Sequence, residues 1–212
     1  MLEAAAPDDP ATIGWWLVDD EALVLGRGSK VTADEVACET AGVSVVRRSS
    51  GGGPVLWGPD LLALDVIVPK GHVLDSDDVA ESYRWLGEAL AHAITELGAP
   101  ANALSPSPVR AAADGMGALA CYASLSPWEV VVGGRKVVGL SQVRRRSGTL
   151  LQAGILLDID AGRLAGLLDL DAATRVILTD TLARRATGLR GHVDLTNREL
   201  IDALTIAVTA AR

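Results

Sequence analysis

Residues 45–60 read VVRRSSGGGPVLWGPD, so that two arginines, two serines and three consecutive glycines interrupt an otherwise apolar run. A turn needs only one or two glycines, and each further glycine costs conformational entropy on folding. Without Cβ atoms, the backbone N–H groups of Gly51–Gly53 can approach a ligand closely, and Arg47 and Arg48 can supply positive charge beside them. The run predicts either a backbone that borders a binding site or a flexible hairpin loop with solvated arginines.

The hydrophobic pattern on either side of this run predicts strands and helices in irregular order. The segment LLALDVIVP is long and mostly apolar, as expected of a strand inside a sheet. Gly133–Gly134, between WEVVV and RKVVGL, is typical of a two-residue hairpin turn. Apolar residues at helical spacing predict a helix over 77–97, and we expect further helices near 160–169, 171–186 and 196–211. Because the strands come in clusters, we expect an α+β fold with mixed, mainly antiparallel sheets packed with helices.

Two helix starts carry the spacing of a capping box, in which a Ser or Thr is followed three residues later by Glu. Thr32 and Glu35 predict the first, with Gly42 as the residue that ends that helix, and Thr196 and Glu199 predict the second. These signals place a helix before the glycine run and another at the end of the chain.

The chain is expected to form one domain. Residues 1–12 are acidic and contain prolines, which predicts a flexible tail, and residues 13–212 then form the single domain. Residues 13–28 predict two short strands joined by the acidic turn Asp19–Glu21. Residues 99–117 are rich in Pro, Ala, Ser and Gly and predict a long loop, which in a compact domain is usually functional or disordered.

The charge distribution narrows the class of partner. The formal net charge is −8 over 212 residues, which repels a phosphate backbone and argues against nucleic-acid binding. Basic residues nevertheless gather in two short windows, which suits a small anionic ligand or an acidic protein partner. The members of these windows are Arg47, Arg48, Arg135, Lys136, Arg144, Arg145 and Arg146.

The sequence also predicts the compartment. The N-terminus lacks the basic start and apolar core of a signal peptide, and no apolar run approaches the length that spans a membrane. The chain has two cysteines, fewer than a small secreted disulfide scaffold carries. We therefore expect a cytoplasmic protein that does not associate with a membrane.

Two side chains, those of Cys121 and Lys136, are candidate catalytic groups from their residue type and position in the sequence. Cys121 is a nucleophile if cations promote its ionisation, and Arg135 and Lys136 lie close to it if the hairpin folds back. The alternatives are that Cys121 is a small buried apolar residue and that Lys136 is a solvated residue on a sheet edge. Cys38 has apolar neighbours within a predicted helix, and we interpret it as a core residue.

The other polar clusters give weaker signals. In QVRRRSG, residues 142–148, three adjacent arginines on an extended segment cannot all face one site, so at least one is expected to be solvated. The histidines His72, His92 and His192 are far apart in sequence and lack partners at the spacing of metal ligands, so we expect no metal site.

Several segments together resemble a known family. LVLGRGSKV followed by AGVSVVRRSSGGGPVL, and CYASLSPWEVVVGGRKVVGLSQVRRRSGTLLQAGILLDID, are similar in order and spacing to the lipoate–protein ligase and octanoyltransferase family, which shares its catalytic domain with biotin ligases. The resemblance covers roughly residues 22–160 and is nearest to the cysteine-dependent octanoyltransferases, which carry their nucleophile before the same hairpin. Two linked motifs are stronger evidence than either alone.

The resemblance implies a transferase that attaches an octanoyl or lipoyl group to a lysine of a lipoyl carrier domain through a Cys121 thioester. Lys136 would stabilise negative charge at the acyl carbonyl. The glycine run would border the acyl pocket and let the main chain wall a narrow tunnel. The substrate-binding residues implied by the same motifs are Arg47, Arg48, Ser50, Gly51, Gly52, Gly53, Gly139, Ser141 and Gln142.

The implied substrates are octanoyl–acyl carrier protein or free lipoate, and the implied acceptors are lipoyl carrier domains of 2-oxoacid dehydrogenases or the glycine cleavage protein. Transfer from a thioester requires no cofactor, because the acyl group is already activated. An ATP-dependent lipoate–protein ligase, which forms an acyl-adenylate with ATP and Mg, is an alternative. A non-catalytic relative that binds an acyl group or a carrier domain is another, because two histidines common in the family are replaced here.

Overall fold

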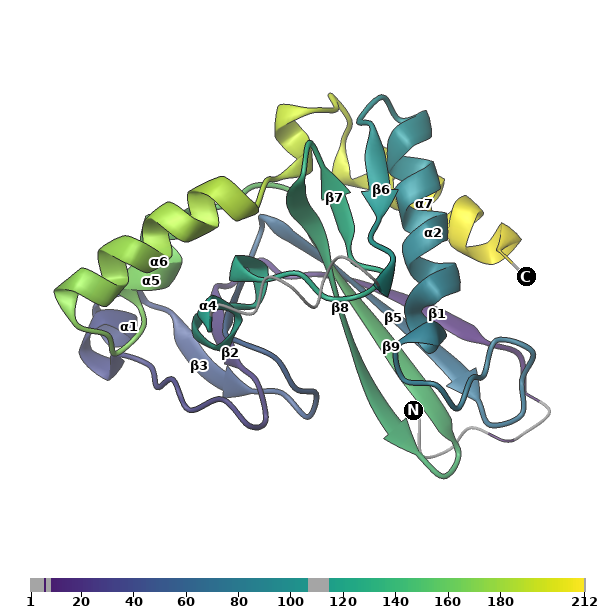
Figure 1. Cartoon of the computed structure of the whole chain (residues 1–212), viewed down its shortest axis with the longest axis horizontal. Coiled ribbons are helices and arrows are strands. Elements are labelled where there is room, and N and C mark those ends of the chain that lie inside the picture. The colour runs from purple at the N-terminus through teal and green to yellow at the C-terminus, as the bar shows by residue number, and fades with distance from the viewer. Residues whose placement is uncertain (1–5, 7–8, 107–114, 212) are drawn as a thin grey trace.

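The computed structural model describes residues 6, 9–106 and 115–211, and within them the strands form two sheets (Figure 1). The larger sheet has six strands, in the spatial order β1 (Thr12–Leu17), β5 (Leu61–Pro69), β9 (Gly148–Leu156), β8 (Arg135–Arg145), β7 (Val130–Val132) and β6 (Ala101–Ala103). The smaller sheet has three, in the order β3 (Ser44–Arg47), β2 (Ala22–Leu25) and β4 (Val55–Trp57). All pairings are antiparallel except β2 with β3, which confirms the mixed, mainly antiparallel α+β class.

The helices cover the two sheets separately. Two helices, α2 (Arg84–Glu96) and α7 (Asn197–Ala210), pack on one face of the large sheet, at the right of Figure 1. Three others lie with the small sheet at the left, namely α1 (Glu35–Ala41), α5 (Ala161–Gly166) and α6 (Ala172–Arg185). The molecule therefore has two hydrophobic cores, one on each face of the large sheet.

Strand β5 belongs to both cores, which explains its continuous apolar sequence. Successive side chains of a strand point to opposite faces, so Leu62 and Leu64 contribute to the core under α2 and α7, whereas Leu61 and Ala63 contribute to the core under the small sheet. A strand buried on both faces is apolar throughout rather than alternating. The prediction of an interior strand over these residues is confirmed.

The tight hairpin and the C-terminal capping box are also confirmed. Gly133 and Gly134 join β7 to β8 with φ values of 56° and 75°, which glycine adopts without strain. At the start of α7, the Thr196 hydroxyl accepts from the Glu199 N–H and the Glu199 carboxylate accepts from the Thr196 N–H.

The predicted capping box at the first helix is wrong. Helix α1 begins at Glu35 with Asp34 as its N-cap, whose carboxylate accepts from the Ala37 N–H at 3.0 Å. The Thr32 hydroxyl instead donates to Asp169, a long-range contact that sequence spacing cannot reveal. The predicted end of the helix is confirmed, since Gly42 has φ 67° and donates to the last carbonyls.

Two other predicted segments have different boundaries in the structure, at places where the periodic apolar pattern runs into a loop. The helix expected over 77–97 starts at Arg84, after a short 3₁₀ turn over Glu81–Tyr83, and Val79 is exposed outside it. The loop expected over 99–117 contains β6 and the short helix α4 (Met116–Leu119), and its residues 107–114 lie outside the described residues.

The N-terminal segments also differ in their partners. The two strands predicted over 13–28 are β1 and β2, but each belongs to a different sheet, and β1 begins at Thr12, the last residue of the predicted tail. Most of the predicted tail lies outside the described residues. No helix in the described parts of the chain is long and apolar enough to cross a membrane.

The capping box of α7 generates a stability prediction. Thr196→Ala removes an acceptor for the Glu199 N–H and is expected to lower the free energy of unfolding by about 1 kcal/mol in urea denaturation. Thr209→Ala is the matched control, because Thr209 is exposed on the same helix and bonds only to carbonyls within it. A loss no greater for Thr196→Ala than for Thr209→Ala would contradict the capping role.

Candidate active site

An apolar cavity of about 260 Å³ lies between the two sheets, and Cys121 and Gly139 are among the residues that line it. Apolar side chains of the small sheet and of β5 form most of its wall, and residues of β8, β9 and the segment around Cys121 complete it. A narrow apolar pocket with few polar groups is suited to a small hydrophobic ligand. The apolar wall consists of Ala22, Val24, Val46, Val55, Trp57, Leu61, Ala63 and Leu64.

Cys121 lines this cavity and is placed there by the backbone of the glycine run. It starts the 3₁₀ turn Cys121–Ala123, and its N–H donates to the Pro54 carbonyl at 2.9 Å. A Cβ atom on Gly53 would lie 2.8 Å from the Cys121 nitrogen and 2.4 Å from the Gly117 carbonyl oxygen, so only glycine fits. Gly53 therefore lets the cysteine segment pack directly against the main chain.

Lys136 places a charged group beside the thiol. It lies on β8 with only 1% of its side chain exposed, so it is not the solvated edge residue that its position after a turn allows. Its Nζ donates to the Cys121 carbonyl at 3.0 Å and to the Ser124 carbonyl at 3.3 Å, and lies 3.9 Å from the Cys121 Sγ. The lysine thus both fixes the backbone of the cysteine segment and puts a positive charge beside its sulfur.

A buried carboxylate compensates that charge. Glu129 Oε1 accepts from Lys136 Nζ at 2.6 Å and from the Leu140 N–H at 3.3 Å, and Oε2 accepts from the Ser126 N–H at 2.7 Å. Burial raises the pKa of Glu129, whereas these donors favour its carboxylate. Burial also opposes the charge of Lys136, but its electrostatic interactions with Cys121 and Glu129 and the hydrogen bond to Glu129 outweigh it and raise the pKa of Lys136 above its ordinary value. The ammonium form is therefore the one that the site holds at neutral pH.

Tyr122 completes the group around Lys136. Its ring centroid lies 5.0 Å from Lys136 Nζ, and its hydroxyl donates to the Gly154 carbonyl at 2.7 Å. Burial, reinforced by electrostatic interactions with Cys121 and Glu129, raises the pKa of Tyr122 well above its ordinary value, so the phenol stays neutral. Sequence analysis missed this residue because its role depends on Gly154, which lies 32 positions away on β9.

Arg47 and Arg48, which precede the glycine run, donate hydrogen bonds to backbone carbonyls. Arg48 donates to the Gly51 carbonyl at 2.8 Å and to the Gly53 carbonyl at 3.1 Å, and it also lines the cavity. Arg47 is exposed and donates to the Gly26 carbonyl at 2.8 Å. None of Gly51, Gly52 and Gly53 lines the cavity itself. The cavity wall that was expected from their main chain is formed instead by the segments that pack against them.

The remaining predicted binding residues divide into two groups. Gly139 and Ser141 line the cavity, and the Ser141 hydroxyl bonds the buried hydroxyl of Ser50 at 3.3 Å, which ties β8 to the loop after β3. Gln142 is not brought to the cavity. Its side chain lies on the other side of β8, where it donates to the Val79 carbonyl and bonds the Ser82 hydroxyl.

Two polar residues that sequence analysis did not select also line the cavity. Gln152 donates to Asp65 at 2.9 Å, and the half-exposed Trp16 donates to the other oxygen of the same carboxylate at 3.1 Å. The signal for Asp65 was its place as the one charged residue in the apolar strand 61–69. Glu129 carried a similar signal, since it opens a run of valines.

The arrangement favours nucleophilic acyl chemistry. A free thiol at an apolar cavity, with an ammonium beside it, has the parts needed to form and stabilise a thioester. The second cysteine, Cys38, is 2% exposed, and burial together with Asp34 and Glu35 raises its pKa, which confirms it as a core residue. In the described residues, no cluster of three or more His, Cys, Asp or Glu side chains could hold a metal ion.

Comparison with known proteins places this chain in a family. Residues 1–209 match the lipoyl protein ligase A/B catalytic domain. The chain is 32% identical over 165 residues to octanoyltransferase LipM of Brevibacillus brevis, covering 75% of this chain and 59% of that protein. It is 31% identical over 195 residues to octanoyltransferase LipM of Kyrpidia tusciae, covering 90% of this chain and 70% of that protein. The chain thus spans about three fifths of the first relative's length.

Solved structures agree on the fold. A bi-partite lipoate protein ligase from Thermoplasma acidophilum superposes with a TM-score of 0.78 at 18% identity, over 99% of this chain and 74% of that one. Lipoate-protein ligase A in a structure bound with ATP gives a TM-score of 0.76 at 19% identity, over 99% and 76%. The sequence match over nearly the whole chain and this shared architecture together show that the chain belongs to the lipoyl protein ligase A/B catalytic domain family.

Proposed function

We propose that this chain is an octanoyltransferase that carries the acyl group as a thioester on Cys121 and delivers it to a lysine of a lipoyl carrier domain. The observation that carries the proposal is the Cys121 thiol at an apolar cavity with the Lys136 ammonium 3.9 Å from its sulfur. The relatives named octanoyltransferase LipM support the same reaction class.

The first step is attack of the Cys121 thiolate on the thioester carbonyl of an octanoyl donor. The carbon–sulfur bond to Cys121 forms, the bond to the donor's thiol breaks, and the departing thiolate takes up the proton that Cys121 gave up. Negative charge develops on the carbonyl oxygen during the attack, and Lys136 is the cation placed to stabilise it. The octanoyl chain occupies the apolar cavity.

The second step is attack of the acceptor lysine, as its free amine, on the Cys121 thioester. An amide forms, the carbon–sulfur bond breaks, and the proton lost by the amine returns to the Cys121 sulfur. A thioester is already activated, so this route uses no cofactor, whereas ATP and Mg would be needed only for a ligase reaction from a free acid. We propose lipoyl carrier domains of 2-oxoacid dehydrogenases or the glycine cleavage protein as acceptors.

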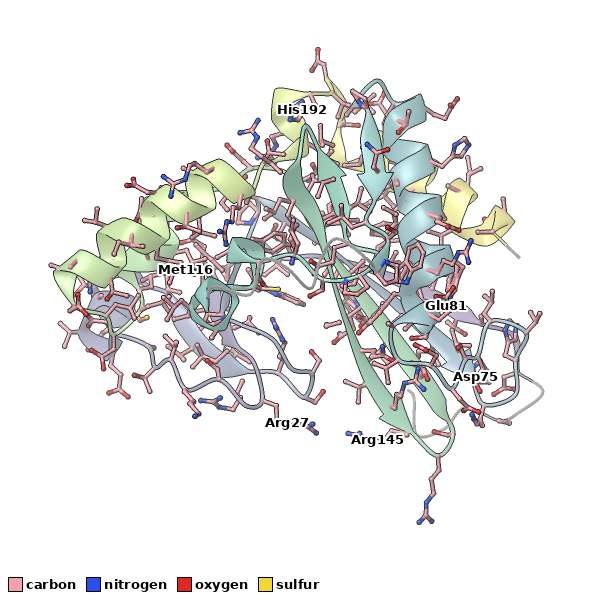
Figure 2. All side chains as sticks on the ribbon, in the orientation of Figure 1. Arg27, Asp75, Glu81, Met116, Arg145 and His192 are labelled. Atoms are coloured by element: carbon pink, nitrogen blue, oxygen red, sulfur yellow. The ribbon has the colours of Figure 1, made fainter. Side chains whose placement is uncertain are left out.

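We propose octanoyl–acyl carrier protein as the donor, because an acidic carrier suits the basic residues at one end of the site. Arg145 and Arg146 are exposed at the end of β8, and Arg145 lies four residues, about 13 Å along the strand, beyond the cavity residue Ser141. Arg27 is exposed after β2, and Figure 2 shows its side chain and that of Arg145 at the same lower end of the molecule, one from each sheet. Positive charge on both sides steers an acidic partner to the site.

The thioester generates the first functional prediction. After incubation with octanoyl–acyl carrier protein, intact-mass analysis should show one octanoyl group on the wild-type chain and on Cys38→Ala, and none on Cys121→Ala. Transfer at the wild-type rate by Cys121→Ala would refute the nucleophile. An acyl-adenylate formed from lipoate with ATP would instead favour the ligase alternative, and binding without any reaction would favour a non-catalytic relative.

The role of Lys136 generates a second prediction. Lys136→Met should lower the rate of octanoyl transfer by about 10²–10³-fold, because the positive charge beside the reacting carbonyl is lost. It also leaves Glu129 buried without its partner, which should cost about 3–5 kcal/mol of unfolding free energy.

The control for that prediction is the double variant Glu129→Gln/Lys136→Met. Removing the unpaired carboxylate should recover most of the lost stability in thermal and urea denaturation, while the transfer rate stays low. Recovery of the rate together with the stability would show that Lys136 acts only through folding.

The arginines generate a third prediction. Arg145→Glu/Arg146→Glu should raise the KM for octanoyl–acyl carrier protein by roughly tenfold at low salt with little change in kcat, and the difference should shrink as salt is added. Arg198→Glu is the control, because Arg198 is exposed on α7, which packs on the opposite face of the large sheet. Equal effects of the two charge reversals would argue against docking at the end of β8.

A further inference from the structure

A second, smaller cavity of about 160 Å³ adjoins the proposed acyl cavity. Its lining combines apolar residues with five charged ones, namely the ion pair of Glu21 with Arg163 and the carboxylates of Asp60, Asp158 and Asp160. Tyr122 and Val55 line both cavities, so these two side chains form the partition between them. The apolar wall of the second cavity beyond the partition consists of Leu56, Pro59, Leu156, Ile159 and Leu164.

Tyr122 is a fixed part of this partition. Its hydroxyl donates to the Gly154 carbonyl at 2.7 Å, and the side chain is almost completely buried. The tip of the ring fills space that Gly154 leaves free, since a Cβ on Gly154 would lie 2.8 Å from its hydroxyl oxygen, whereas a Cβ on Gly139 would make only an ordinary contact of 3.4 Å with its Cζ. Its face is held against the Lys136 ammonium. A side chain fixed at its tip and on its face does not swing aside at low cost.

The position of this wall limits what can be carried on Cys121. An acyl group on the Cys121 sulfur extends into the first cavity. The volume of this cavity is below the range of about 300–1,000 Å³ that is typical of pockets for drug-sized ligands. A longer chain has to cross the partition or leave its terminal methylenes in water. Each methylene left unburied forfeits about fourfold in affinity.

We propose that Tyr122, with Val55, is the specificity-determining partition that restricts the enzyme to medium acyl chains, and that the second cavity receives the end of a longer chain when the partition is reduced. This inference rests on the proposed function, because it assumes that the acyl group is carried on Cys121. Chain-length selection then resides in one aromatic ring next to the nucleophile in sequence rather than in the distant wall of the cavity.

The test compares acyl chains of different length on the same variant. Wild-type chain and Tyr122→Leu are incubated with octanoyl– and dodecanoyl–acyl carrier protein, and the ratio of the two rates of adduct formation is measured by intact mass. Tyr122→Leu should raise the dodecanoyl-to-octanoyl ratio by at least about tenfold. A ratio is used because Tyr122 also contacts Lys136, and a general loss of rate cancels from it.

Three further variants separate the partition from other effects. Tyr122→Phe keeps the ring and should leave the ratio within about twofold of wild type. Val55→Ala opens the partition without altering the residue beside Cys121 and should raise the ratio in the same direction. Leu164→Trp, added to Tyr122→Leu, refills the second cavity and should reverse the gain for dodecanoyl while octanoyl is unaffected.

The outcomes distinguish this inference from the proposed function. If wild type takes octanoyl and neither Tyr122→Leu nor Val55→Ala changes the ratio, the partition is refuted and the proposed function stands. If Tyr122→Leu does not fold, Val55→Ala decides alone. If no variant forms an adduct, the proposed function fails, and calorimetric binding of octanoate and dodecanoate to the same variants tests the partition, with an unchanged affinity ratio counting against it.

Discussion

The ion pair of Lys136 with Glu129 is the interaction around which the site is built. Both side chains are almost fully buried, at 1% and 2% exposure, and burying two charges costs several kcal/mol per ion unless hydrogen bonds compensate. The compensation comes from the carbonyls of Cys121 and Ser124 and from two backbone N–H groups. The hydrogen bonds that offset the cost of burying the ion pair therefore also fix the cysteine segment. The charge beside Cys121 and the position of its sulfur thus depend on the same contacts.

Close backbone packing is the second constraint, and it explains the glycines. Gly53 admits the cysteine segment, and a Cβ on Gly26 would lie 2.0 Å from the Gly52 carbonyl oxygen, so the loop closes on β2 as well. Gly154 makes room for the Tyr122 hydroxyl, since a Cβ there would lie 2.8 Å from it. The glycines allow protein segments to pack closely against one another, and the ligand cavity is the space beside those contacts.

The two-sheet architecture gives the cavity its chemical character. The large sheet is buried on both faces at β5, and the small sheet covers one of those faces. The contact between them is apolar along the small sheet and polar where Ser50, in the loop after β3, meets Ser141. Within the large sheet, the bonded pair of Asp65 and Gln152 adds further polar groups to the cavity wall. The cavity is apolar with a few hydrogen-bonded polar groups, because an apolar sheet lies across β5, a strand that carries one charged residue.

The sequence by itself determined the elements whose signals are local: the buried strand 61–69, the glycine hairpin, the second capping box and the order of motifs that identifies the family. Only the tertiary structure decided that Asp34 rather than Thr32 caps the first helix, that Lys136 is buried beside Cys121 rather than solvated at an edge, and that Gln142 faces away from the cavity. It also decided the part played by Tyr122. Periodicity and turn chemistry act within a few residues, whereas charge burial and side-chain fit depend on contacts between strands far apart in the chain, which only the folded arrangement brings together.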